Sequence, residues 1–166
     1  MYESLVKEFE SKGNFKLLKG QESSFDWPHS SGVYAVWDVS SIRRVLLYVG
    51  MTGKYSRVGS EVVFNTGVLS KRSQRWTPYR FCESKMDGDL RYTFRFGPKL
   101  SNTNAQASIK YDSDAYGNTV RYENIEIDCF IIEANDSKYT PTLVEAMILA
   151  DQIKKGNSLP PANNEH

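Results

Sequence analysis

The chain has 166 residues, a length typical of one domain, and its 21 Lys and Arg nearly balance its 20 Asp and Glu to leave a net charge of +1. Hydrophobic residues make up 40%, which allows a packed core, whereas no apolar run approaches the roughly 18 residues of a membrane-spanning helix. Two Cys without a CxxC pattern and two His exclude a disulfide framework and a Cys-rich or His-rich metal site. The acidic, amphipathic start is unlike a signal peptide, so we expect a cytoplasmic protein with reduced thiols and no membrane partner.

The small net charge hides a segregation of charge along the chain. Residues 54–99 contain ten basic and four acidic side chains, residues 100–166 contain five basic and ten acidic ones, and residues 1–53 are balanced. A basic segment interleaved with aromatic residues suits the phosphate backbone of DNA, although an ordinary solvent-exposed face has the same composition. The candidate DNA-contacting residues of this segment are Lys54, Arg57, Lys71, Arg75, Arg80, Arg91 and Arg95.

The first part of the chain predicts one helix followed by three strands. Residues 2–12 have apolar side chains at helical spacing and are followed by Gly13, which favours a helix end there. Residues 14–19 predict a short strand, and the apolar runs 33–37 and 45–49 predict two further strands joined as a hairpin. Because these two runs are apolar at consecutive positions, we expect this hairpin to be central and buried on both faces.

The second part predicts two more helices and two more strands. Residues 68–76 favour a helix, residues 92–96 alternate as a strand, and residues 101–119 have the Asn, Ser, Asp and Gly content of a surface loop. Residues 124–133 predict a strong strand, and residues 140–155 predict a helix that begins with a Thr-Pro capping pattern. The expected fold is α+β, with a small central antiparallel sheet of three core strands flanked by helices, in a single domain over residues 1–166.

One carboxylate stands out within the last predicted helix. Glu145 is surrounded by seven apolar residues between Leu143 and Ala150, and a helix that is apolar all round is expected to be largely buried. A buried carboxylate needs a partner, because an unpaired charge in an apolar medium is too costly. We therefore expect Glu145 to pair with an arginine or to meet a metal ion; a simple ion pair or an edge-exposed Glu is the alternative.

These features together resemble the GIY-YIG nuclease family. The first motif of that family is matched by Gly32-Val33-Tyr34 and the second by Tyr48-Val49-Gly50, on the two paired strands. Glu145 fits the family's helical glutamate, and the segment 159–163, Leu-Pro-Pro-Ala-Asn, fits its C-terminal element. The resemblance covers residues 31–76 and 124–164, so that residues 1–30 and about 77–123 read as an N-terminal extension and a mid-chain insertion.

The sequence also departs from the family pattern. The family arginine matches Arg72 within Leu69-Ser-Lys-Arg72, while Arg75 and Arg57 remain alternatives. The position one turn later, where many members have a His, is Trp76, so a proton relay through that His is absent or replaced. At the C-terminal element, Asn164 competes with Asn163 as the family asparagine.

The resemblance implies a metal-dependent endonuclease that hydrolyses DNA phosphodiester bonds. Glu145 is then the ligand of a divalent metal, Mg²⁺ or Mn²⁺, and the planar guanidinium of Arg72 stabilises charge on the phosphate. Tyr34 is the implied base for the attacking water, with Tyr48 hydrogen-bonded nearby and Asn163 bracing the site. An unperturbed phenol titrates near ~10, so a tyrosine base needs a metal or a cation, such as Lys54, beside it.

Two other functions remain open from the sequence. The missing His and the displaced arginine suit a non-catalytic nucleic-acid-binding module on the same fold. The low net charge suits a protein-interaction domain whose resemblance to nucleases is accidental. If the chain is a nuclease, one cutting site needs two passes or a homodimer to break both strands, and residues 77–123 could read bases or form the oligomer contact.

Overall fold

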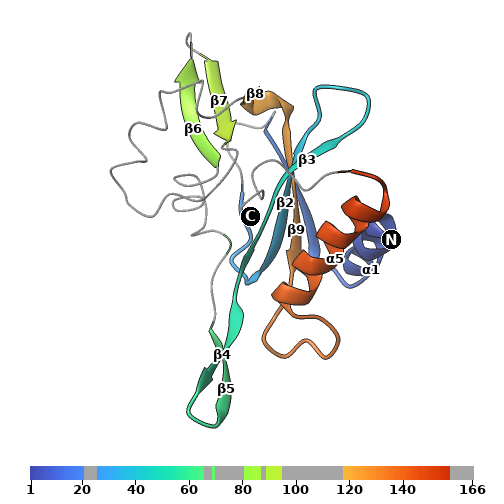
Figure 1. Cartoon of the computed structure of the whole chain (residues 1–166). Helices are drawn as coiled ribbons and strands as arrows, with labels where there is room; N and C mark the ends of the chain where they lie inside the picture. The colour runs from blue at the N-terminus through green and yellow to red at the C-terminus, as the bar shows by residue number, and fades with distance from the viewer. Residues whose placement is uncertain (21–25, 66–68, 70–80, 87–88, 95–117, 158–166) are drawn as a thin grey trace.

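A computed structural model describes residues 1–20, 26–65, 69, 81–86, 89–94 and 118–157. Its centre is a four-stranded antiparallel sheet with the strand order β1-β9-β2-β3 (Figure 1). The strands are β1 (Phe15–Lys19), β2 (Gly32–Asp38), β3 (Val45–Thr52) and β9 (Ile125–Ile131). The α+β class is therefore confirmed, but the sheet has four strands rather than the expected three, because β1 pairs along its whole length with β9.

The predicted hairpin of β2 and β3 is present, but its two strands differ in position. β2 lies inside the sheet between β9 and β3, whereas β3 is an edge strand of this sheet, so the expectation that both are central holds only for β2. A bulge between Val36 and Trp37 shifts the register near the closed end of the hairpin. Most side chains of β3 are nevertheless buried, since the layers above and below the sheet cover them.

Two helices cover one face of this sheet. They are α1 (Tyr2–Ser11) and α5 (Pro141–Lys154), which lie side by side across the sheet in Figure 1. The Thr140 hydroxyl caps α5 by accepting a hydrogen bond from the backbone N–H of Leu143 at 3.2 Å, as the Thr-Pro pattern predicts. The expectation that α5 is buried all round is wrong: Leu143 and Ile153 are 45% and 56% exposed, and only the side toward the sheet is packed.

The opposite face of the sheet carries a second apolar cluster. It is built from side chains of all four strands together with Trp27 and Leu69, and the N–H of Leu69 donates to the Ser30 carbonyl at 2.9 Å. Its buried members are Leu18, Trp27, Tyr34, Val36, Leu47, Leu69, Ile125, Ile127 and Cys129. The sheet is thus buried on both faces, which explains the continuous apolar runs in its strands.

The remaining strands form two small sheets outside the central one. A two-stranded ribbon, β4 (Lys54–Val58) and β5 (Glu61–Asn65), follows β3 directly. A three-stranded sheet contains β6 (Phe81–Met86), β7 (Asp89–Phe94) and β8 (Asn118–Arg121), and the 3-10 turn η1 (Tyr122–Asn124) joins it to β9.

The second half of the chain follows its predicted elements only in part. β7 overlaps the strand expected over 92–96, and β8 occupies the end of the loop expected over 101–119. The sequence did not predict β4, β5 or β6. The helix expected over 68–76 lies outside the described residues apart from Leu69. Among the described residues, no helix has the length and apolar character needed to cross a membrane.

A buried carboxylate on β9 ties α1 to the sheet. Asp128 is 1% exposed, accepts a hydrogen bond from the Tyr2 hydroxyl, and pairs with the Arg44 guanidinium at 3.1 Å. Arg44 also stacks 4.4 Å from the ring centroid of Trp37. The pKa of Tyr2 is raised well above its ordinary value. Burial is the largest cause and the negative charge of Asp128 is the next.

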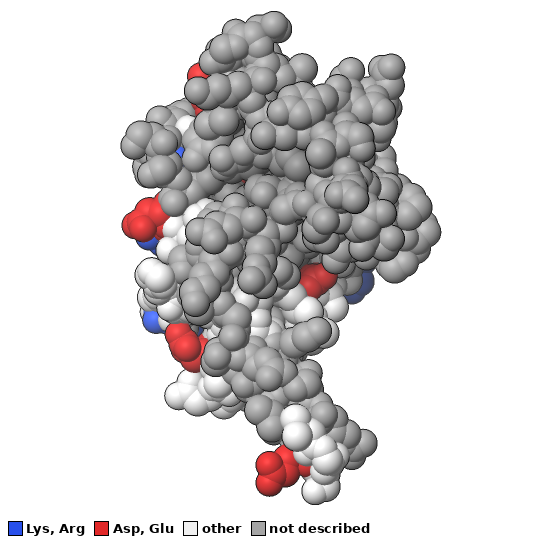
Figure 2. Space-filling view, turned by 90° about the vertical axis from the view of Figure 1, so that its left-hand side faces the viewer, with Lys and Arg blue, Asp and Glu red and all other residues white. Residues whose placement is uncertain are grey.

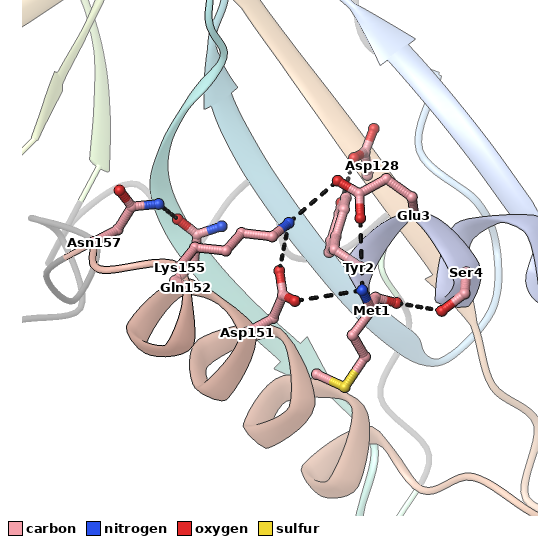
Figure 3. A network of polar contacts seen from close by, with 9 residues as sticks. All are labelled: Met1, Tyr2, Glu3, Ser4, Asp128, Asp151, Gln152, Lys155 and Asn157. Carbon is pink, nitrogen blue, oxygen red and sulfur yellow. Dashed lines mark hydrogen bonds and ion pairs between the residues drawn. The ribbon is translucent and has the colours of Figure 1, made fainter.

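A second polar contact joins the start of α1 to the end of α5 (Figure 3). The Lys155 ammonium lies 2.9 Å from Asp151 and 3.1 Å from Glu3, and the amino group of Met1 lies 3.7 Å from Asp151. The hydrogen bond to Asp151 is the main cause that raises the pKa of Lys155. The negative charge of the buried Asp151 carboxylate is thus balanced by two cationic groups where the two helices meet.

We expect Tyr2→Phe to lower the free energy of unfolding by about 1.5–3 kcal/mol, because it removes a buried hydrogen bond to a charged acceptor. Urea denaturation measures this change. Tyr139→Phe is the matched control: its hydroxyl donates to Glu8 at 2.5 Å, near the surface, and its loss should cost less. Equal losses in both variants would contradict a special role for the Asp128 contact.

The stability of the folded protein should depend on pH through the Glu8 carboxylate. Hydrogen bonds from Lys138 and then Tyr139 lower the pKa of Glu8 from 4.5 to about 2. The folded carboxylate binds a proton less readily than the unfolded one, so its stabilisation is complete above about pH 4.5 and is lost as the pH falls toward 2. Thermal unfolding between pH 2 and 6 should show a shallower loss of stability for Glu8→Gln than for the wild type. The same slope in Glu8→Gln and the wild type would contradict this contribution of Glu8.

Candidate functional site

The two motif tyrosines lie on the same face of the sheet. The register sets Tyr34 opposite Gly50 and Val36 opposite Tyr48, and directly opposed residues of antiparallel strands share a face. The ring centroids of Tyr34 and Tyr48 are 5.8 Å apart, with the ring planes inclined at 42°. Tyr34 is fully buried and Tyr48 half-buried. The prediction that the two motifs occupy adjacent strands is therefore confirmed, and the rings touch.

Gly50 is the residue that permits this arrangement. A Cβ atom built on Gly50 would overlap the Cζ and hydroxyl oxygen of Tyr34 and would lie 2.7 Å from Cε1 of Tyr48. The Tyr34 ring therefore lies directly over the Gly50 backbone, in the space that any other side chain would occupy. Gly32 has a comparable constraint, because a Cβ there would overlap the Phe130 carbonyl on β9. Both motif glycines are needed for close packing whatever the function of the site.

Trp27 also packs against the Tyr34 ring. The two rings meet edge to face, with centroids 5.4 Å apart and planes inclined at 89°. Tyr34 thus contacts both Trp27 and the Gly50 backbone, and the Gly50 contact places its hydroxyl next to β3. The sequence did not predict the Trp27 contact, because the turn-rich segment before β2 gave no signal of its position over the sheet.

Glu145 approaches β3 from the opposite face. It is half-buried on α5, three residues after Thr142, whose hydroxyl lies 3.7 Å from the Met51 sulfur on β3. Residues three apart lie on the same side of a helix, so Glu145 belongs to the side of α5 turned toward the β3 edge. The two tyrosines and the carboxylate therefore flank the same edge strand from opposite faces of the sheet.

Glu145 is only half-buried, which changes what partner its carboxylate requires. The expectation that Glu145 needs an arginine or a metal as its partner assumed that the helix is buried on all sides. The exposed residues of α5 show that it is not. A half-buried carboxylate can keep part of its hydration. The role of Glu145 as a metal ligand now depends on the family resemblance and on its place beside β3.

The other predicted site residues are only partly covered by the structure. Arg72 and Asn163, with the alternatives Arg75 and Asn164, lie outside the described residues. Of the candidate DNA-contacting residues, Lys54 and Arg57 belong to β4 and Arg91 to β7, whereas Lys71, Arg75, Arg80 and Arg95 lie outside the described residues. Figure 2 marks the Lys, Arg, Asp and Glu side chains among the described residues on one face of the molecule.

Within the part of the chain that the structure describes, no group of three or more His, Cys, Asp or Glu could hold a metal ion. Mg²⁺, however, is commonly bound by one or two carboxylates, with waters and substrate phosphates completing the coordination. A single half-buried Glu145 fits an arrangement of this kind. The buried Asp128 and Asp151, which the sequence did not single out, are instead used in the ion pairs that hold α1 and α5.

Comparison of the chain with protein-family models, with curated proteins and with solved structures finds no match. The class that the structure defines is an α+β protein with a four-stranded antiparallel sheet and two helices packed on it.

We expect Gly50→Ala to destabilise the protein by about 1–3 kcal/mol, because its methyl group would displace the Tyr34 ring. A double-mutant cycle measured by urea denaturation tests the cause. In a Tyr34→Ala background the methyl group has room, so Gly50→Ala should cost clearly less there. Equal costs in both backgrounds would show that Tyr34 does not impose the constraint on Gly50.

Proposed function

We propose that the protein is a metal-dependent endonuclease of the GIY-YIG type that hydrolyses DNA phosphodiester bonds. The observation that carries the proposal is the pairing of Tyr34 and Tyr48 over Gly50. The tyrosines of two separate sequence motifs meet in ring contact on adjacent strands, beside the edge strand that Glu145 flanks from the other face. The basic segment 54–99 supports a nucleic-acid substrate.

In this proposal each residue has a distinct task. Tyr34, which contacts Trp27 and lies over Gly50, accepts the proton of the attacking water, and the more exposed Tyr48 orients that water or a phosphate oxygen. A phenol ordinarily titrates near ~10, so Tyr34 needs positive charge nearby to act at neutral pH. Arg72 would supply such charge and stabilise the negative charge that develops on the phosphate. Asn163 would brace the site.

Glu145 would hold the divalent metal, Mg²⁺ or Mn²⁺. When bound, the metal supplies Lewis-acid stabilisation of the phosphate and lowers the pKa of bound water. Glu145 reaches the site from α5, whose N-terminus is fixed by the Thr140 cap and whose C-terminal turn is held by Lys155. The carboxylate is therefore carried by a helix that is anchored at both ends, which limits the conformational entropy lost when the metal binds.

Incubation of supercoiled plasmid with the full chain tests the proposal. With Mg²⁺ or Mn²⁺ the wild type should nick or linearise the plasmid, and a chelator should prevent this. We expect Glu145→Gln to slow cleavage by about 100-fold or more, and Tyr34→Phe by about 10²–10⁴-fold. Glu133→Gln, at an exposed position before α5, should cleave like the wild type.

Thermal unfolding of the same variants separates chemistry from folding. Tyr34→Phe and Glu145→Gln should unfold within a few degrees of the wild type, since neither changes the shape of the packed core. Metal-dependent cleavage that survives Glu145→Gln would contradict the proposed metal ligand. Salt-sensitive DNA binding without cleavage under any divalent metal would favour a non-catalytic binding module. Failure to bind DNA at low salt would leave a protein-interaction domain.

A further inference from the structure

The side of α5 that faces away from the sheet is apolar. Leu143 and Ile153 are 45% and 56% exposed, and Ala146 and Ala150 are exposed as well. On the opposite side of the same helix, Ile148 is 1% exposed and packs in the core. At about 100° per residue, the four exposed side chains all lie within about 40° of the direction opposite Ile148. They therefore form one continuous row along the helix, which we call the outer ridge.

The outer ridge belongs to a helix whose position is fixed. Figure 1 shows α5 packed on one face of the central sheet, at the side of the molecule. Thr140 caps its first turn, and Lys155, just after its last residue, pairs with Asp151 and Glu3. A partner that binds the outer ridge would therefore meet a preformed surface, and little conformational entropy would be lost on binding.

The order of residues along the outer ridge is the same in both directions. A leucine and an isoleucine stand at its two ends, two alanines stand between them, and the spacings are three, four and three residues. Reversal about the level of Ile148 exchanges Leu143 with Ile153 and Ala146 with Ala150. A two-fold symmetric interface requires a surface that matches itself in this way. The outer ridge therefore fits the same ridge of a second copy in antiparallel orientation.

The side chains of the outer ridge suit packing between two helices. The alanines at its centre allow two helix backbones to approach closely, and the larger residues fill the space at its ends. All four are apolar, so their burial removes no charge from water. The 14 residues of α5 span about 21 Å with a width of about 10 Å, which gives a contact far smaller than the roughly 800 Å² per partner of a standard interface. The dimer should accordingly be weak, with a dissociation constant of about 10–100 µM.

We propose that α5 is the interface of a two-fold symmetric homodimer, in which the outer ridges of two copies pack against each other in antiparallel orientation. This inference goes beyond the proposed function and stands on the geometry of α5.

The consequence of this dimer for cleavage rests on the proposed function. Glu145 lies about 120° around the helix from the centre of the outer ridge, so the pairing would not cover it. The two-fold axis keeps Glu145 of both copies on the same side of the helix pair. Two candidate sites would then act on the two strands of one duplex.

Sedimentation equilibrium of the full chain tests the pairing. Leu143→Lys and Ile153→Glu should each weaken the dimer about tenfold or more, because each sets a charge against an apolar residue. The double variant should recover the wild-type affinity to within about threefold, because an antiparallel pair sets each lysine opposite a glutamate. Ile42→Glu, at a fully exposed position on the loop between β2 and β3, is the matched control and should dimerise like the wild type.

Four results would overturn the inference. The first is a wild type that stays monomeric at about 200 µM, including one that instead sediments with vesicles of anionic lipid and loses this binding in Ile153→Glu. The second is a dimer that both single variants leave unchanged. The third is unfolding of the single variants many degrees below the wild type, which would mean that the outer ridge packs within its own chain. The fourth is loss of the dimer in both single variants without recovery in the double variant.

Plasmid cleavage separates this inference from the proposed function. If both hold, the wild type at a concentration near the dissociation constant should form linear plasmid with little nicked intermediate, and Leu143→Lys should accumulate the nicked form. A dimer that follows the charge exchange, in a chain that never cleaves, would support the inference and contradict the nuclease proposal. Cleavage by a chain that is monomeric at every concentration would overturn the inference alone.

Discussion

The antiparallel register of β2 and β3 sets Tyr34 opposite Gly50, and the ring of Tyr34 fills the space that a side chain at Gly50 would need. Much of the structure depends on this contact. A slip of the pairing by one residue would turn every side chain of one strand to the other face. It would also set Val49 or Met51 opposite Tyr34 in place of Gly50. Trp27 packs edge to face against Tyr34, so the position of Tyr34 also constrains the segment that precedes β2. The candidate site is a consequence of how these two strands pair.

The helical layer on the opposite face is held by buried charge as well as by apolar packing. The buried Asp128 accepts a hydrogen bond from the Tyr2 hydroxyl and pairs with the Arg44 guanidinium, and the buried Asp151 pairs with Lys155. Removing one partner of such a pair leaves an uncompensated charge, so these contacts fix the positions of α1 and α5. The position of α5 in turn brings Glu145 to the edge of β3, and a layer that serves stability thereby positions a candidate metal ligand.

The end of β3 brings two glycines with different roles close together in the chain. Gly50 lies at the end of the tyrosine pair, and Gly53, three residues later, directs the chain into the ribbon. The close packing at Gly32 and Gly50 also shows that a tripeptide motif can be required by packing alone, so the motifs acquire functional meaning only through the tyrosines they bring together.

The sequence by itself determined the α+β class, both helices that flank the sheet, the cap at Thr140 and the pairing of the two motif strands, because hydrophobic period, capping residues and glycine boundaries are local signals. Only the tertiary structure decided that β1 joins the sheet, that β3 is an edge strand, that α5 is buried on one side, and that Glu145 approaches from the face opposite the tyrosines. It alone located the partners of Asp128, on residues 84 and 126 positions away in the chain. Contacts between residues so distant in sequence depend on how the layers pack, and no local pattern encodes them.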